Sequence, residues 1–239
     1  MSLSYARSLL ITDPIIIIAT IVMGTISLLV SLFESDGRVQ HNISRVWSRM
    51  LLGVSGVKMR IEGLDKIDPA GAYVFVSNHR SLMDTPVVLA HVPLQFRFLA
   101  KRGLFLIPIL GTHLRRAGHL PVVKGDPRAS LKSMSEGAKM VARRRISLLL
   151  FPEGGRSAEG LRPFKEGAAY IAIKAGVPIV PMALVGMRDL LPMGSGHIRS
   201  GRVVLRIGDP IPTAGLKPSD RDSLNQRLYA EVARMLDAR

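Results

Sequence analysis

A histidine and an aspartate lie five residues apart where a strand-forming run ends. The run 72–78 (AYVFVSN) leads into His79, and Asp84 precedes Thr85 and Pro86, a pair typical of a helix N-cap and first helical position. We expect Asp84 to lie just outside that helix, with its carboxylate free to turn back to the imidazole. A carboxylate on one ring nitrogen fixes the tautomer, while the other nitrogen can take a proton from a substrate hydroxyl. The spacing therefore predicts a general base; the alternative is that Asp84 only caps the helix and His79 is a turn residue.

A second polar segment also follows a hydrophobic run. The run 146–151 (ISLLLF) leads into Pro-Glu-Gly-Gly-Arg-Ser, in which Gly154 and Gly155 allow close backbone approach and Arg156 offers a planar group suited to a phosphate. These features predict an anion site at a strand end. The alternative is a tight turn in which Glu153 and Arg156 form a solvated ion pair.

The two segments together are more specific than either alone. Residues 78–84 (NHRSLMD) resemble the NHxSxxD signature, and residues 151–157 (FPEGGRS) resemble the FPEGTRS signature, of the lysophosphatidic acid acyltransferases (1-acylglycerol-3-phosphate O-acyltransferases). Residues 101–118 and 177–181 resemble the second and fourth blocks of that family. The resemblance covers roughly residues 57–186, and the N-terminal apolar segments are similar to those of bacterial members.

The resemblance implies a glycerolipid acyltransferase fold in which a lipid hydroxyl attacks an acyl thioester. His79 would be the general base and Asp84 its orienting partner. Substrate binding is expected from Asn78, Ser81, Lys101, Glu153, Gly154, Gly155 and Arg156. The acyl donor would be acyl-CoA or acyl carrier protein, and no cofactor or metal is implied. Direct transfer agrees with the absence of cysteine, because no thiol acyl-enzyme is required.

Three positions depart from the family pattern. Gly103 stands where a glutamate is usual, Lys124 where an arginine is usual, and Gly155 where the signature has threonine. The base and its partner are unchanged, so we expect acyl transfer to the sn-2 hydroxyl of lysophosphatidate, forming phosphatidate. Another lysolipid acceptor is the alternative, because the altered positions belong to the expected acceptor pocket.

The basic composition limits the partners. The 239 residues carry a formal net charge of +15, which would attract anionic membrane lipids, nucleic acid or an acidic carrier protein. Aromatic residues make up only 5%, and no zinc-finger, RRM or basic-zipper pattern occurs, so no nucleic acid is expected. The histidines lack metal-ligand spacing, and His113, His119 and His197 are expected in turns or on the surface. A non-catalytic basic membrane-binding module remains the non-enzymatic alternative.

An uncharged N-terminal segment predicts membrane association. Residues 15–33 contain no charge and would form a helix about 28 Å long, starting with Asp13 as N-cap and Pro14 in its first turn. Residues 43–54 form an amphipathic pattern with Trp47, typical of an interfacial helix. The basic remainder is expected to face the cytoplasm from the inner membrane. Whether the first helix spans the bilayer or enters one leaflet stays open.

Strand and helix patterns alternate in the rest of the chain. Strands are predicted at 57–63, 72–78, 96–100, 119–123, 146–151, 178–186 and 201–208. Helices are predicted at 86–91, 108–115, 127–145, 166–175 and 219–238. This order predicts an α/β sandwich with a mixed, mostly buried sheet flanked by helices, preceded by a membrane helix pair. The expected division is 1–56 for the membrane-associated helices and 57–239 for the acyltransferase domain.

Overall fold

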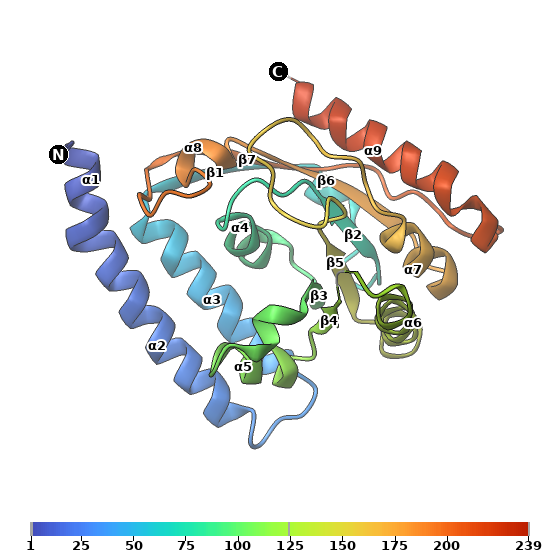
Figure 1. The fold of residues 1–239 in the computed structure, drawn as a ribbon, viewed down its shortest axis with the longest axis horizontal. Helices are drawn as coiled ribbons and strands as arrows, with labels where there is room; N and C mark the ends of the chain where they lie inside the picture. The colour runs from blue at the N-terminus through green and yellow to red at the C-terminus, as the bar shows by residue number, and fades with distance from the viewer. Residues whose placement is uncertain (1, 124, 239) are drawn as a thin grey trace.

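Seven strands form one mixed sheet in the order β1-β7-β6-β2-β5-β3-β4 (Figure 1). The structure is a computed structural model that describes residues 2–123 and 125–238. The strands are β1 Val57–Glu62, β2 Val74–Ser77, β3 Phe96–Lys101, β4 Leu120–Val122, β5 Ser147–Leu150, β6 Ile179–Val185 and β7 Gly201–Ile207. Neighbours run parallel except β6 and β7, which are antiparallel. Each strand falls on a predicted run, and the predicted mixed sheet is confirmed.

Helices cover both faces of this sheet. On one face pack α3 (Arg38–Val54), α4 (Asp84–His91) and α8 (Met187–Leu190), and on the other α6 (Pro127–Arg144), α7 (Gly167–Ala175) and α9 (Arg221–Asp237). In β2, Phe75 points into the first core while Val74 and Val76 point into the second. Successive strand residues alternate between faces, so a strand buried on both sides needs an unbroken apolar run. The predicted sandwich follows from this pattern.

The N-terminal helix begins earlier than predicted. Segments α1 (Leu3–Arg7), a π-helical turn (Ser8–Thr12) and α2 (Asp13–Val30) form one helix of 28 residues, which contains an 18-residue stretch with a mean hydropathy of 2.2. The prediction of Asp13 as N-cap was wrong, because Ser2 caps the helix by accepting a hydrogen bond from the backbone of Tyr5. Pro14 therefore lies inside the helix, where it lacks an N–H donor, and the π-helical turn directly precedes it.

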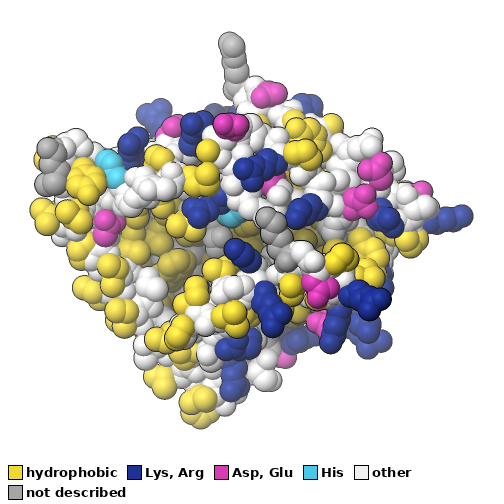
Figure 2. All heavy atoms as spheres, in the orientation of Figure 1, with side chains coloured by type: hydrophobic (Ala, Val, Ile, Leu, Met, Phe, Trp, Pro, Cys, Tyr) yellow, Lys and Arg dark blue, Asp and Glu magenta, His cyan; other side chains and the backbone are white. Residues whose placement is uncertain are grey.

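This long helix lies against the rest of the chain along most of its length. Its side-chain hydrogen bonds to distant segments include Ser4 Oγ with His197 Nε2 (3.0 Å), Arg7 Nη2 to Ser55 O (2.8 Å), Trp47 Nε1 to Thr20 Oγ1 (3.0 Å) and Ser27 Oγ with His113 Nδ1 (2.8 Å). Its other side exposes apolar side chains such as Leu10, Ile18 and Ile21. Hydrophobic side chains accordingly gather over α1 and α2 in Figure 2.

A buried polar junction joins the helix pair to β3. The Arg97 side chain is only 1% exposed and donates hydrogen bonds to the carbonyls of Phe96 (3.0 Å) and Asp36 (2.9 Å). Burial lowers the pKa of Arg97 to about 10. His41 packs edge-on against Phe96, with ring centroids 4.7 Å apart. Burial, and then the charges of Arg97 and Arg45, lower the pKa of His41 to about 3, so this imidazole is neutral near pH 7.

Of two further histidines that the sequence placed in turns or on the surface, His119 is buried and His113 is half-buried. His119 accepts a hydrogen bond from the backbone of Phe98 through Nδ1 (2.9 Å), and burial lowers its pKa well below the usual value. His113 lies on α5 (Leu110–Arg116), which packs on α2, and burial lowers its pKa as well. The prediction was wrong for these two because their burial depends on α2, α3 and β3, which are distant in sequence.

Candidate active site

Three adjacent parallel strands carry the site at their C-terminal ends. Within the sheet β5 lies between β2 and β3, and His79 follows β2, Glu153 follows β5 and Lys101 ends β3. Neighbouring strands lie about 4.8 Å apart, so the backbone of Lys101 lies about 10 Å from the loop after β2. The topology therefore brings three of the predicted site residues to one edge of the sheet, the usual place for chemistry in such folds.

His79 and Asp84 form a hydrogen-bonded dyad. His79 Nδ1 lies 2.7 Å from Asp84 Oδ2, which also accepts hydrogen bonds from the backbone N–H groups of Arg80 (2.6 Å) and Ser81 (2.9 Å). The Asp84 side chain is fully buried, whereas that of His79 is 18% exposed. Because a carboxylate only accepts hydrogen bonds, Nδ1 carries the proton and Nε2 keeps a free lone pair. This is the geometry of an oriented general base.

The helix after His79 begins two residues earlier than predicted. Asp84 is the first residue of α4, the N-cap position belongs to Met83, and Thr85 does not cap the helix. Asp84 still binds the imidazole, because residues 81–84 form a turn closed by the hydrogen bond from Asp84 N to Ser81 O (3.3 Å). The same carboxylate thus stabilises the turn before the helix and orients His79, which combines the two alternatives considered from the sequence.

Phe151 fixes the plane of the His79 imidazole. Its ring stacks on that of His79 with centroids 4.1 Å apart and an interplanar angle of 13°. With Asp84 at the ring edge and Phe151 against its face, the imidazole has little freedom to rotate. Phe151 was quoted in the signature but was not predicted to act at the site. No local pattern marks it, because the contact depends on the register of β2 beside β5.

Glu153 holds two loops together through its carboxylate. Oε1 accepts a hydrogen bond from the backbone N–H of His79 (2.7 Å) and Oε2 one from that of Arg162 (3.0 Å), and the side chain is nearly buried. Glu153 therefore positions the backbone of the general base, and its predicted substrate contact stays a prediction. Within the described part of the chain no ion pair joins Glu153 to Arg156, so the alternative of a solvated pair was wrong.

Asn78 and Ser81 are supports of the catalytic loop. Both side chains are fully buried. The Asn78 amide donates to Leu184 O (2.9 Å) and accepts from Leu184 N (2.8 Å), which attaches the loop to β6. The Ser81 hydroxyl donates to Leu191 O (3.0 Å). These contacts hold the dyad in place, and the predicted substrate-binding role of both residues stays a prediction.

Cations and glycines border the dyad. Arg156 is half-buried and Lys101 is exposed. Gly154 has a φ of +73°, where a Cβ would lie 2.9 Å from Lys165 Nζ, whereas a Cβ on Gly155 would meet no atom within 4 Å. Lys165 thus lies beside the glycine loop although the sequence reasoning did not single it out. These groups supply the positive charge and backbone access that an anion site needs.

The two remaining departures from the family pattern lie in the β3–α6 region. A Cβ on Gly103 would meet no atom within 4 Å, so a larger side chain fits there. Lys124 lies outside the described residues. Among residues 2–123 and 125–238, no three histidine, cysteine, aspartate or glutamate side chains gather in a metal-binding arrangement.

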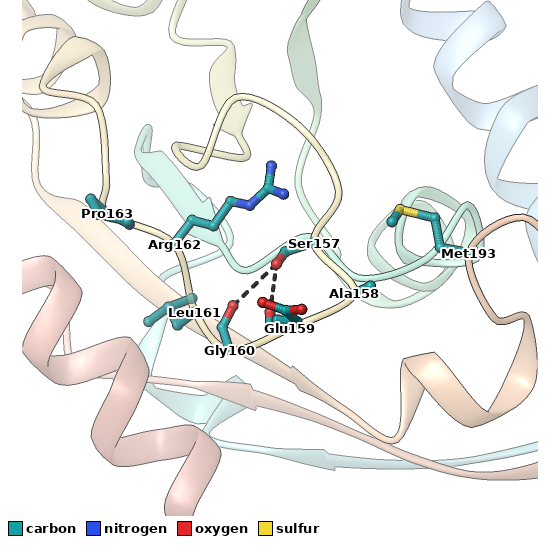
Figure 3. Close-up of a pocket in the computed structure, with 8 residues that line it drawn as sticks. All are labelled: Ser157, Ala158, Glu159, Gly160, Leu161, Arg162, Pro163 and Met193. Carbon is teal, nitrogen blue, oxygen red and sulfur yellow. Dashed lines mark hydrogen bonds between the residues drawn. The ribbon is translucent and has the colours of Figure 1, made fainter.

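A pocket of about 410 Å³ lies beside the dyad (Figure 3). Its lining residues are Ser157, Ala158, Glu159, Gly160, Leu161, Arg162, Pro163 and Met193. The Ser157 hydroxyl binds the Glu159 and Gly160 carbonyls and so curls the loop, while Arg162 and Met193 stand on opposite sides of Ser157. Since Ser157 N donates to His79 O (3.1 Å), the wall of the pocket is joined directly to the loop of the general base.

Known proteins resemble this chain in sequence and in fold. A family described as Acyltransferase matches residues 58–185. The chloroplastic 1-acyl-sn-glycerol-3-phosphate acyltransferase BAT2 of Brassica napus is 34% identical over 82% of this chain and 57% of that protein. The Arabidopsis thaliana protein LPAT1, which bears the same enzyme name, is 32% identical over 84% and 55%. The chain thus spans little more than half the length of these plant relatives.

Two further related proteins align with this chain over a larger share of their own length. The 1-acyl-sn-glycerol-3-phosphate acyltransferase alpha of Bos taurus is 32% identical over 80% of this chain and 68% of that protein. The crystal structure of the 1-acyl-sn-glycerophosphate (LPA) acyltransferase PlsC from Thermotoga maritima superimposes with a TM-score of 0.80, 25% sequence identity, and coverage of 98% of this chain and 96% of that chain.

Proposed function

Since the chain belongs to the acyltransferase family, we propose that it transfers a fatty acyl group from an acyl thioester to the sn-2 hydroxyl of lysophosphatidate, forming phosphatidate. The observation that carries this proposal is the dyad, in which buried Asp84 lies 2.7 Å from His79 Nδ1 and leaves Nε2 free as a base. The names of the relatives support lysophosphatidate as acceptor.

The dyad supports a direct transfer. His79 Nε2 takes the proton of the acceptor hydroxyl, whose oxygen forms a bond to the thioester carbonyl carbon. Asp84 stabilises the imidazolium that results. The carbon–sulfur bond then breaks, and His79 returns the proton to the departing thiolate. The chain's residues suffice for this proton transfer, so we propose no cofactor or metal; acyl-CoA or acyl carrier protein is the co-substrate.

Recognition of the acceptor phosphate is assigned to the cations at the same edge of the sheet. Arg156 lies on the loop after β5, the strand next to β2, and Lys101 ends β3, one strand farther from the loop that carries His79. A planar guanidinium binds phosphate oxygens through two parallel hydrogen bonds, and a lysine adds charge. Holding the phosphate there would place the glycerol hydroxyl toward the base, so that binding energy serves orientation.

Radiolabelled acyl transfer to a panel of lysolipids in detergent tests the proposal. We expect wild-type transfer from acyl-CoA or acyl carrier protein to lysophosphatidate and its loss in His79→Ala. His91→Ala is a matched control, because it removes a histidine from α4 that does not contact the dyad. Transfer only to another lysolipid would keep the mechanism and change the acceptor. No transfer by folded wild type, or full activity of His79→Ala, would favour a basic membrane-binding module instead.

We further propose that the protein attaches to the cytoplasmic side of the inner membrane with its N-terminal helix in the plane of the bilayer. A spanning helix crosses a hydrocarbon core about 30 Å thick, in which the polar surface of an attached domain would find no water. Here polar contacts to the domain occur from Ser4 to Ser27, so crossing the bilayer would carry the domain into the lipid. An in-plane helix instead inserts its exposed apolar side and leaves the other side on the protein.

The cysteine-free chain makes this orientation testable. Single variants Ser2→Cys and Ser35→Cys place one thiol at each end of the helix, and both positions are exposed. In sealed inside-out vesicles, an impermeant maleimide should label both variants, because both ends lie on the cytoplasmic side. Labelling of only one would indicate a spanning helix, and labelling of both only in right-side-out vesicles would reverse the orientation.

A further inference from the structure

Helix α6 separates a packed face from a charged face. Its buried residues Ser133, Gly137, Ala138 and Val141 line one side. Four exposed cations spaced by four or seven residues line the other side, together with the exposed Glu136. These cations, named here the basic stripe, are Arg128, Lys132, Lys139 and Arg143. Such spacing places side chains on one helix face, and the stripe is about 22 Å long.

The basic stripe is rigidly mounted and free of ion pairs. A Cβ on Gly137 would come within 2.8 Å of a Leu148 methyl group, so the glycine lets α6 lie close on β5. Across the described ranges, the ion pair made by α6 is that of Arg144 with Asp36, which lies outside the stripe. Four cations held on one rigid face without internal partners are available to an acidic partner.

One end of the basic stripe points toward the active edge of the sheet. Strand β4 runs parallel to β3, so both end at the edge where His79 lies, and α6 starts at Pro127 shortly after β4. Arg128 therefore lies toward the site, while Arg143 lies toward the opposite edge. In Figure 2, Lys and Arg side chains gather over the α6 side of the molecule and hydrophobic ones over α1 and α2.

We propose that the basic stripe is the docking surface for an acidic acyl carrier protein that delivers the acyl thioester. The inference rests on the proposed function, which requires a lipid acceptor and an acyl thioester to reach one dyad. The acceptor arrives from the apolar α1–α2 side. A carrier protein is water-soluble, and an acidic helix laid along the basic stripe would bring its flexible acyl-bearing arm to the end of the stripe nearest the site.

The arrangement of the layers favours a protein over a bilayer at this surface. Helix α6 packs on one face of the sheet, and α3, with α2 outside it, packs on the other (Figure 1). The apolar side of α2 and the basic stripe therefore point in different directions. A flat bilayer that receives α2 does not also cover the basic stripe, whereas a small carrier protein reaches it from solution.

The test compares two donors that carry the same palmitoyl group. The kcat/KM of wild type and of the triple variant Arg128→Glu, Lys132→Glu, Lys139→Glu is measured with palmitoyl-acyl carrier protein and with palmitoyl-CoA, using lysophosphatidate as acceptor. We expect kcat/KM to fall at least about tenfold with the carrier protein, mainly through KM, and to change less than about twofold with palmitoyl-CoA. Retained activity with palmitoyl-CoA shows that the variant is folded. The triple glutamine variant serves if the glutamate variant does not fold.

A matched control separates the effect of this surface on activity from the effect of the protein's net charge. Lys58→Glu, Arg202→Glu and Arg227→Glu change the net charge by the same amount at exposed sites on β1, β7 and α9. This control should keep its activity with the carrier protein. Each of four results would overturn the proposal. The control and the α6 variant could lose the same activity with the carrier protein, or the α6 variant could lose the same activity with both donors. The α6 variant could also be unchanged, or lose only its binding to anionic vesicles. If wild type uses neither donor, the proposed function itself fails.

Discussion

Replacing Asp84 by asparagine tests the dyad without removing its shape. Asp84 Oδ2 accepts three hydrogen bonds, while Oδ1 is buried without a partner among the residues described. The asparagine amide can place its oxygen at the Oδ2 position and its NH2 group at the Oδ1 position, which keeps all three acceptor contacts. What disappears is the negative charge beside His79.

The expected effects on stability and rate differ in size. Hydrogen bonds to a charged acceptor contribute about 1.5–3 kcal/mol and neutral ones about 0.5–1.5 kcal/mol, so three weakened bonds lower the free energy of unfolding by about 3–4.5 kcal/mol. Burying a neutral amide rather than a carboxylate offsets part of that loss. The rate should fall by about 10³–10⁴, because the imidazolium formed during proton transfer loses its partner. That factor corresponds to about 4–5.5 kcal/mol in the activation barrier.

Two measurements on Asp84→Asn separate these effects. Urea unfolding gives the change in stability, and single-turnover acyl transfer at saturating substrate gives the rate of the chemical step. Asp65→Asn makes the same chemical change at an exposed position in the short helical turn after β1, away from the site. If folded Asp84→Asn keeps more than about a tenth of the wild-type rate while His79→Ala loses activity, Asp84 does not stabilise the imidazolium and the reasoning is refuted.

Three further predictions concern stability, each measured by equilibrium urea unfolding. Asn78→Ala leaves the buried N–H and C=O of Leu184 without partners and should lower the free energy of unfolding by about 2–4 kcal/mol; a change below about 1 kcal/mol would contradict the support role. Gly155→Thr should change the free energy of unfolding by less than about 0.5 kcal/mol, whereas Gly154→Ala, at a φ of +73°, should lower it by about 1–2 kcal/mol. A larger loss in Gly155→Thr than in Gly154→Ala would be inconsistent with this loop geometry. Because the pKa of His41 falls to about 3 on folding, only the unfolded state takes up its proton between pH 6.5 and pH 3, so stability is full above pH 6.5 and decreases as the pH is lowered. Between pH 7 and pH 5 this one group should remove about 2 kcal/mol, an effect absent from His41→Leu; equal pH dependence of both proteins would show that another group is responsible.

Local sequence patterns were sufficient to predict the strands of the sheet and the two residues of the dyad. All seven strands fall on predicted runs: β2, β5 and β6 are buried on both faces and largely apolar along their length, whereas the edge strand β1 alternates half-buried apolar residues with the exposed Lys58 and Arg60. His79 and Asp84 were found because the strand end and the following helix both leave local signals. The start of the first helix was wrong because Asp13-Pro14 imitates a cap, while the true start depends on Ser2 and on packing against distant segments.

Long-range contacts account for what the sequence did not predict. Phe151 stacks on His79, and Glu153 accepts a hydrogen bond from the backbone of His79, only because β2 lies beside β5. No local pattern encodes that pairing. The burial of His119 likewise depends on its contact with the backbone of Phe98 on β3. The sequence thus predicted the two residues that form the dyad, and the structure adds the groups that hold them in place.

The pairing of the first strand with the last has a consequence for the order of folding during synthesis. Strand β1 lies at the edge of the sheet beside β7, with Val57 in register with Gly201. The ribosome therefore releases the apolar N-terminal helix and β1 long before their strand neighbour exists. Pairing between such distant segments is slow, while an apolar helix can enter a bilayer as soon as it emerges. Under this order, the nascent chain would reach the membrane first and close its sheet there.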